Sequence, residues 1–116
     1  MKIQNFSEIE EQEVTMEGAS GARMRLLIAE RDGATNFAMR MFTVQPGGYT
    51  PFHFHDYEHE VFVLEGEGVL KGETEERRFR AGDVIFVKPN EKHQFRNVGE
   101  QNLRFLCLIP TRDPCA

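Results

Sequence analysis

Two stretches of the sequence, PFHFHDYEHE at 51–60 and NEKHQF at 90–95, contain every histidine of the chain: His53, His55, His59 and His93. Side chains alternate across a β-strand, so residues of the same parity share a face. The first three histidines are odd-numbered and are expected to point inward together, while the fourth comes from a separate segment. This distribution predicts a fold that gathers two distant segments around one centre.

The sequence around these stretches predicts an all-β domain. No run of ten or more residues holds the 3.6-residue period of a helix. Short segments rich in β-branched and aromatic residues alternate with breaks rich in Gly, Pro, Asn and Asp, which is typical of a sandwich or barrel. The expected strands are 22–30, 36–44, 59–70, 76–81, 83–89, 93–98 and 103–110.

The length and composition indicate one domain. A chain of 116 residues with 40% hydrophobic residues can bury a core without disulfides. We expect the barrel at 22–110, an N-terminal extension at 1–21 and a C-terminal tail at 111–116. Cys107 lies in an apolar run and Cys115 is next to last, so both are expected to be unpaired.

The charge and hydropathy of the chain exclude several classes of partner. A net charge of −5 argues against nucleic acid and anionic membranes, because both require a basic face. The N-terminal segment lacks the apolar core of a signal peptide, and no segment approaches 18 apolar residues. The sequence therefore favours a cytoplasmic protein. Several expected strands are apolar on both parities, for instance at Val61 and Val63 beside Phe62 and Leu64, which predicts covered faces on both sides and favours a homodimer.

The histidine pattern indicates a metal site. A lone histidine in a β-protein is more often a surface or core residue than a ligand. An H-x-H pair with a third histidine in register and a fourth near a turn favours metal binding instead. Imidazole is the commonest neutral ligand for first-row metals. The sequence predicts that all four histidines hold one divalent ion, and Glu60 is the alternative ligand if His59 points away.

The same residues resemble the two motifs of the cupins. The stretch from Gly48 through the H-x-H pair to Gly66 is similar to the first motif, and the stretch from Gly82 through His93 to Asn97 is similar to the second. The 15 residues between the motifs match the spacing of small microbial cupins. The resemblance covers about 22–110 and implies a double-stranded β-helix of jelly-roll type, usually dimeric.

Three departures from the cupin pattern affect what the resemblance implies. His59 stands at the position of the usual glutamate, which implies a four-histidine site with one negative charge fewer. Pro89 lies one position late, and Asn90 and Glu91 replace the usual glycine, so we expect a turn of different shape that leaves His93 in place. The chain is similar to four-histidine cupins that bind manganese, with iron, zinc, nickel and copper as alternatives.

Three further residues are candidate catalytic groups. Arg40 is either a structural arginine at a barrel rim or interface, or a cation that orients a carboxylate or enolate substrate. Tyr57 shares parity with the first three histidines and either closes the pocket or stays on the turn. Resemblance to the manganese cupins implies that Cys107 faces the cavity, as a thiol beside the site or as an inert buried one.

Three functions are compatible with this site. The leading hypothesis is a metal-dependent oxygenase of the dioxygenase type, acting on a small organic substrate at open coordination positions. An isomerase or lyase that polarises a carbonyl or enediol through the metal is the alternative within enzymes. A non-catalytic module that binds a small ligand or a metal is the third, and a closed tetrahedral zinc site would favour it. The fold alone does not decide between them.

Overall fold

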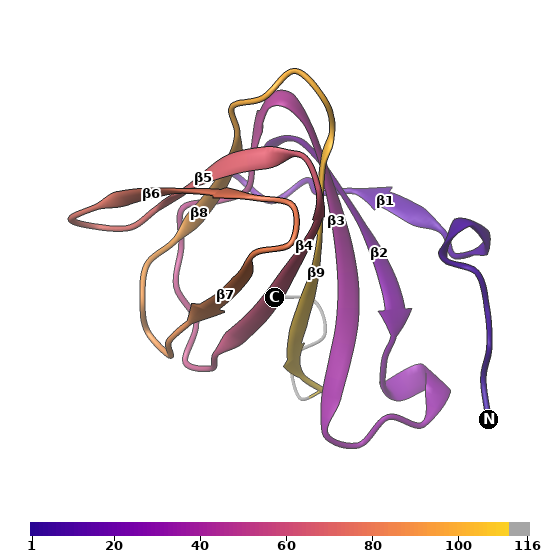
Figure 1. Cartoon of the computed structure of the whole chain (residues 1–116). Coiled ribbons are helices and arrows are strands. Elements are labelled where there is room, and N and C mark those ends of the chain that lie inside the picture. Colours follow the sequence, from indigo (N-terminus) through magenta and orange to yellow (C-terminus); the bar gives the residue numbers. More distant parts are fainter. Residues whose placement is uncertain (112–116) are drawn as a thin grey trace.

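The computed structural model describes residues 1–111, and within that range nearly all of the regular secondary structure is β-strand (Figure 1). This confirms the predicted fold class. None of the helices in the described range has the length and hydrophobicity needed to cross a membrane. Cys115 and most of the predicted C-terminal tail lie outside the described residues. The elements in chain order are η1 (Phe6–Glu8), β1 (Glu11–Glu13), β2 (Ser20–Ile28), η2 (Glu30–Asp32), β3 (Phe37–Tyr49), β4 (His59–Glu65), β5 (Glu67–Lys71), β6 (Glu76–Arg80), β7 (Val84–Val87), β8 (Gln94–Asn97) and β9 (Leu103–Pro110).

The strands form one curled antiparallel sheet. Its order is β6-β5-β8-β3-β9-β4-β7, and β2 pairs with β3 while β1 pairs with β2. The long strand β3 belongs to both halves, because it pairs with β9 from Phe37 to Val44 and reaches β8 through Tyr49 and Arg96. In Figure 1, β2, β3, β9 and β4 lie on one side of the curled sheet and β5, β6 and β8 on the other.

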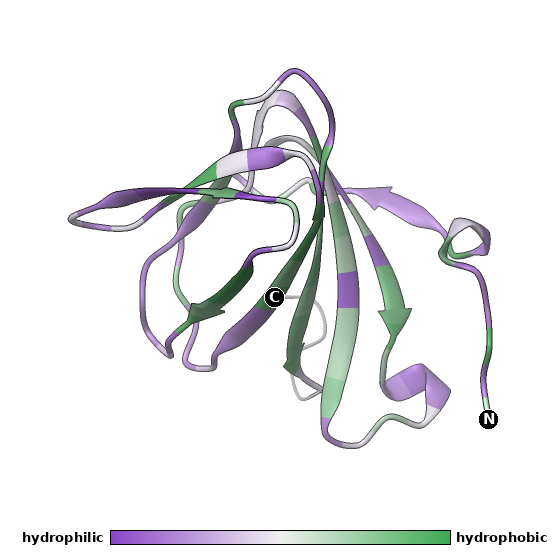
Figure 2. Ribbon diagram, in the orientation of Figure 1, coloured by the Kyte–Doolittle hydropathy of each residue, from purple (hydrophilic) through white to green (hydrophobic). Residues whose placement is uncertain are grey.

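The hydrophobic core fills the concave side of this sheet. In β4, Val61 and Val63 are buried, whereas the alternate residues Phe62 and Leu64 stay exposed. In β9 the odd-numbered residues are buried in the same alternating way. Figure 2 shows the hydrophobic residues concentrated along β4, β7 and β9. The alternation of side chains along each strand therefore sets which residues face inward.

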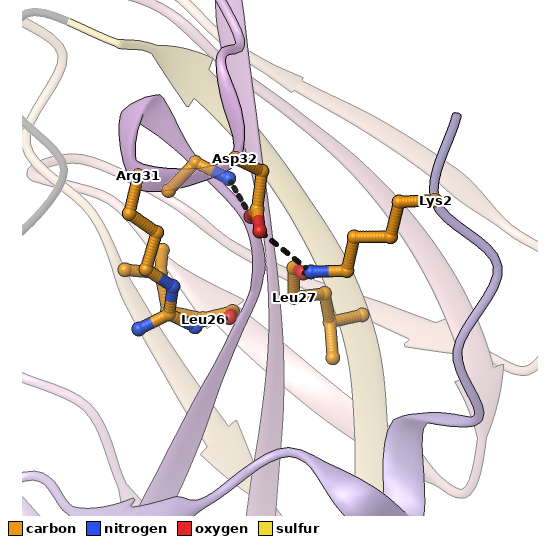
Figure 3. A network of polar contacts seen from close by, with 6 residues as sticks. Lys2, Leu26, Leu27, Arg31 and Asp32 are labelled. Carbon is orange, nitrogen blue, oxygen red and sulfur yellow. Dashed lines mark hydrogen bonds and ion pairs between the residues drawn. The ribbon is translucent and has the colours of Figure 1, made fainter.

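The N-terminal residues are held against the barrel by specific contacts. Lys2 donates a hydrogen bond of 3.0 Å to the carbonyl of Leu27 and forms an ion pair of 2.9 Å with Asp32 (Figure 3). The Nε of Arg25 donates to the carbonyl of Ile9 at 3.0 Å. These contacts, with the β1–β2 pairing, fix residues 1–13 along the second strand.

One glycine makes the sharp connection between β4 and β5. Gly66 has a φ of 86°, and a Cβ there would lie 2.6 Å from the carbonyl oxygen of Asn102. A side chain at this position would be both strained and blocked by backbone. The turn sends the chain from the β4 side of the sheet to the β5 side.

Candidate metal centre

The two histidine segments are joined by backbone hydrogen bonds. His53 and His93 form an isolated antiparallel bridge, with N–H to carbonyl distances of 3.2 and 2.9 Å. The N–H of Asn90 donates to the carbonyl of His55. Asn90 has a φ of 66°, a left-handed conformation that asparagine tolerates better than most residues. Asparagine thus adopts a glycine-like conformation in this turn, and His93 lies against the first motif.

Three of the histidines form a tight group. One ring nitrogen from each of His53, His55 and His93 lies within 4.8 Å of the others. The Nε2 atoms of His53 and His55 are 3.2 Å apart. The ring of His59 lies beside this group, with its centre 5.1 Å from His55 and 5.0 Å from His93. The structure therefore brings all four rings together, and the ring nitrogens of His53, His55 and His93 form the tight group.

Hydrogen bonding determines which nitrogen of His93 can bind a ligand. Its Nδ1 lies 2.8 Å from the backbone carbonyl oxygen of Glu91. A carbonyl only accepts hydrogen bonds, so Nδ1 carries the proton and Nε2 keeps its lone pair. Ligating histidines in proteins are commonly oriented by such a bond.

Burial favours the neutral form of His53, His59 and His93. Burial first, and the positive charge of Arg40 second, together lower the pKa of His59 to about 2. Burial likewise lowers the pKa of His53 to about 4, and it lowers that of His93. A histidine must be neutral to bind a metal through nitrogen, so these three meet this condition without a change of protonation at neutral pH.

The residues present fit a metal ion. Two nitrogens about 2.1 Å from one ion and at right angles to each other would be about 3 Å apart, close to the observed 3.2 Å between His53 and His55. The Nε2 of His59 is buried and has no hydrogen-bond partner among residues 1–111, which a bound ion would satisfy. Glu60, the alternative ligand, is exposed and borders a different hollow.

Arg40 and Cys107 meet directly beside His59. They are paired across β3 and β9, and the Nη2 of Arg40 lies 3.2 Å from the Sγ of Cys107. The Nδ1 of His59 is 3.0 Å from the same sulfur and 3.5 Å from the same Nη2. Arg40 is only 3% exposed, and burial raises the pKa of the Cys107 thiol. The structure thus places both candidate residues next to a histidine ring.

Tyr57 lies behind the histidine rings. It is buried, and its ring stacks on His55 with the centres 4.9 Å apart and the planes 4° apart. It borders the outer hollow near Pro110, whereas the cavity that the histidines line does not include it. This position supports the orientation of the His55 ring rather than contact with a ligand.

His53, His59 and His93 line one end of a cavity of about 340 Å³. Arg40 and Cys107 line it as well, and stacked phenylalanines form much of its wall: the ring centre of Phe105 lies 5.3 Å from that of Phe42 and 4.6 Å from that of Phe95. Parity in the sequence could have linked two of these rings to the site, because Phe42 shares a face with Arg40 and Phe105 shares one with Cys107.

The other end of the cavity is formed by a segment that sequence reasoning did not connect with the site. Gln12–Met16, here called the strap, lines the cavity together with Met24. The strap continues from β1, and Val14 donates to the carbonyl of Ala22 at 2.9 Å. No motif marks this segment, because its place depends on pairing with β2.

Comparison with known proteins places the chain among proteins of similar size and fold. The polyketide cyclase RemF from Streptomyces resistomycificus superposes with a TM-score of 0.90 at 35% identity, over 96% of this chain and 80% of RemF. The oxalate-binding protein of Thermotoga maritima is 32% identical over 81% of this chain and 80% of its own length. Polyketide synthase CurC from Streptomyces cyaneus is 36% identical over 64% of this chain, which spans about half of CurC (49%).

A family match covers most of the barrel. Residues 40–109 match the cupin domain family (Cupin_2). This range includes both histidine segments, Arg40 and Cys107. The fold and the two histidine motifs agree with the match, and the chain therefore belongs to the cupin domain family.

Proposed function

We propose that the protein is a metal-dependent enzyme that acts on the carbonyl or enol group of a small, largely apolar molecule carrying an anionic oxygen. This reaction belongs to the isomerase, lyase or cyclase type. One observation supports it above the others: a single cavity joins a neutral histidine cluster, a buried arginine and a stacked phenylalanine wall.

The histidines would hold the metal. His53, His55 and His93 form the tight group, and His59 is the fourth ligand. A divalent ion held by neutral ligands alone would supply a strong Lewis acid for a carbonyl oxygen. Manganese as the physiological ion and a cytoplasmic location stay predictions of the sequence.

The remaining side chains bind and orient the molecule. Arg40 is nearly fully buried, so its guanidinium can hold an anionic oxygen where little water competes. The phenylalanine wall offers flat faces to a ring system. The cavity volume of about 340 Å³ suits a molecule of two or three rings.

The relatives support this reaction type. RemF is called a polyketide cyclase, and the Thermotoga maritima relative is called an oxalate-binding protein. A cyclase acts on a carbon chain, and oxalate is a small dianion. In this chain the apolar wall would accommodate the carbon skeleton of a ligand, and the histidine cluster with the arginine would accommodate its anionic oxygen.

The oxygenase expected from the sequence is the second candidate. The same histidine cluster favours it, because an ion held by three or four protein nitrogens retains positions for dioxygen and substrate. The two enzymes differ in whether dioxygen is consumed. A binding module without turnover would show neither reaction.

The test uses 1-indanone-5-carboxylate, a flat molecule with an enolisable ketone and a carboxylate. Protein loaded with Mn(II) or Zn(II) is expected to accelerate exchange of the hydrogens next to the ketone for deuterium, observed by NMR in D2O. The His93→Ala variant sets the background. Dioxygen uptake without exchange would favour the oxygenase, and binding without either reaction would favour the module; both outcomes would contradict the proposal.

We also propose that the protein is a homodimer, with the outer face of β4 and β7 as the interface. Phe62, Leu64, Val84 and Phe86 are 43–76% exposed and lie on paired strands. These four side chains include no charge, so a second copy can cover them without bringing like charges together. Phe62→Asp is expected to give a monomer by light scattering, while Lys88→Asp on the same side of the barrel is expected to remain dimeric.

A further inference from the structure

His59 differs from His93 in the partner of its second ring nitrogen. In His93 a backbone carbonyl accepts from Nδ1, which leaves Nε2 available. In His59 the neighbour of Nδ1 is the sulfur of Cys107 at 3.0 Å, and Nε2 is buried without a hydrogen-bond partner among residues 1–111. An imidazole can bind a metal through Nε2 only if the proton is on Nδ1. The group that faces Nδ1 therefore decides whether His59 can be a ligand.

The surroundings of the sulfur favour its role as an acceptor. Arg40 can only donate, and its Nη2 lies 3.2 Å from the Sγ of Cys107. The sulfur thus already accepts on one side, and a hydrogen bond from His59 Nδ1–H would make it accept on the other. The opposite tautomer would bury an Nε2–H with no acceptor in the described part of the chain, whereas this one presents a lone pair that a metal ion satisfies.

We propose that Cys107 is a positioning residue: its sulfur accepts from His59 Nδ1–H and thereby makes Nε2 of His59 the fourth metal ligand. The inference rests on the metal site of the proposed function and adds what sets its ligand number. Without this acceptor the site would retain the three histidines of the tight group. The role assigned to Cys107 is therefore indirect, and it acts on the ion through His59.

The β-ladder fixes this contact. Cys107 is paired with Arg40 on one side and with Val61 on the other, and His59 lies two residues before Val61 on the same face of β4. Cys107 is only 1% exposed, so its sulfur is held in place by packing. A side chain without an acceptor at this position would leave His59 Nδ1 with only the cationic Arg40 nearby.

Cobalt(II) is a suitable probe, because its visible absorption changes with the number and type of ligands. Cys107→Ala is expected to bind Co(II) about 10–100-fold more weakly than the unmodified protein, as for other residues that orient a ligating histidine, and to show an altered spectrum. Cys107→Ser is expected to lie closer to the unmodified protein, because a hydroxyl oxygen also accepts. Ile109→Val, buried on the same face of β9, is the matched control and should keep both affinity and spectrum.

The outcomes separate this inference from the proposed function. If Cys107→Ala binds Co(II) with the affinity and spectrum of the unmodified protein, the positioning role is wrong and the metal site stands. If the unmodified protein binds no Co(II), the proposed function and the inference both fail. Should Cys107→Ala not fold, long-range 1H–15N spectra of the Zn(II)-loaded protein give the answer, with His59 assigned from His59→Gln. They are expected to show Nδ1–H, and an Nε2–H would overturn the inference.

Discussion

The two ends of the cavity are built in different ways. The histidine end is held by paired strands and by the His53–His93 bridge, and some of its polar side chains are almost completely buried, with His59 at 4% and Arg40 at 3% exposure. The strap end depends on a three-residue strand, and its Met16 is 46% exposed. Rigid central strands therefore carry the chemistry, while a peripheral segment closes the space in which a ligand lies. Changes at the two ends should have separable effects.

The largest effect is expected from His93→Ala. It removes a ligand whose Nε2 is already oriented by Glu91, and residues that merely orient ligands alter metal affinity about 10–100-fold. We expect Mn(II) or Zn(II) affinity to fall by more than about 100-fold, measured by elemental analysis and competition with a chelator. Lys92→Ala, next to it in the sequence, is the control. Unchanged stoichiometry in the His93 variant would remove the metal site.

Arg40→Met tests the anion-binding part of the histidine end. Hydrogen bonds to charged groups contribute about 1.5–3 kcal/mol, so the affinity for 1-indanone-5-carboxylate should fall about 10–100-fold while metal content stays the same. Calorimetry on the metal-loaded protein measures the ligand affinity, and elemental analysis measures the metal content. Arg104→Met, which alters an ion pair with Glu65 outside the cavity, is the control. If Arg40→Met instead fails to fold, the structural role left open by the sequence is the correct one.

The contrast between the two ends also explains which features could be predicted from the sequence. Parity and motif spacing predicted the barrel and the convergence of the histidines, although the first segment is no continuous strand: a bend at 56–57 precedes β4. Parity does not carry across that bend, and Tyr57 lies behind the rings rather than along the cavity. The meeting of Cys107 with His59 requires the register of β9 against β4, and the strap requires that of β1 against β2. Such long-range registers cannot be predicted from one sequence.

Acid should destabilise the metal-free protein through the histidine end. The pKa of His53 is lowered from 6.5 to about 4 and that of His59 to about 2, mainly by burial. Below pH 6.5 the unfolded chain takes up protons that the folded protein does not, so this stabilisation is present above pH 6.5 and declines as the pH falls toward 4. We expect the melting temperature to drop between pH 7 and pH 5. His59→Gln removes one titrating group and should show a smaller drop; parallel curves would contradict the assignment.

The smallest effect is expected at the strap end, from Met16→Ala. The side chain lines the cavity but is about half exposed, so its removal takes away only part of an apolar contact. Burial of one methylene contributes about 0.8 kcal/mol, which predicts a loss of only a few-fold in affinity for 1-indanone-5-carboxylate. Metal content should not change, because no strap residue belongs to the histidine group. Ile3→Ala, exposed and away from the cavity, is the control. A metal loss in Met16→Ala would show that the two ends are coupled, and an unchanged affinity would mean that bound ligand does not reach the strap.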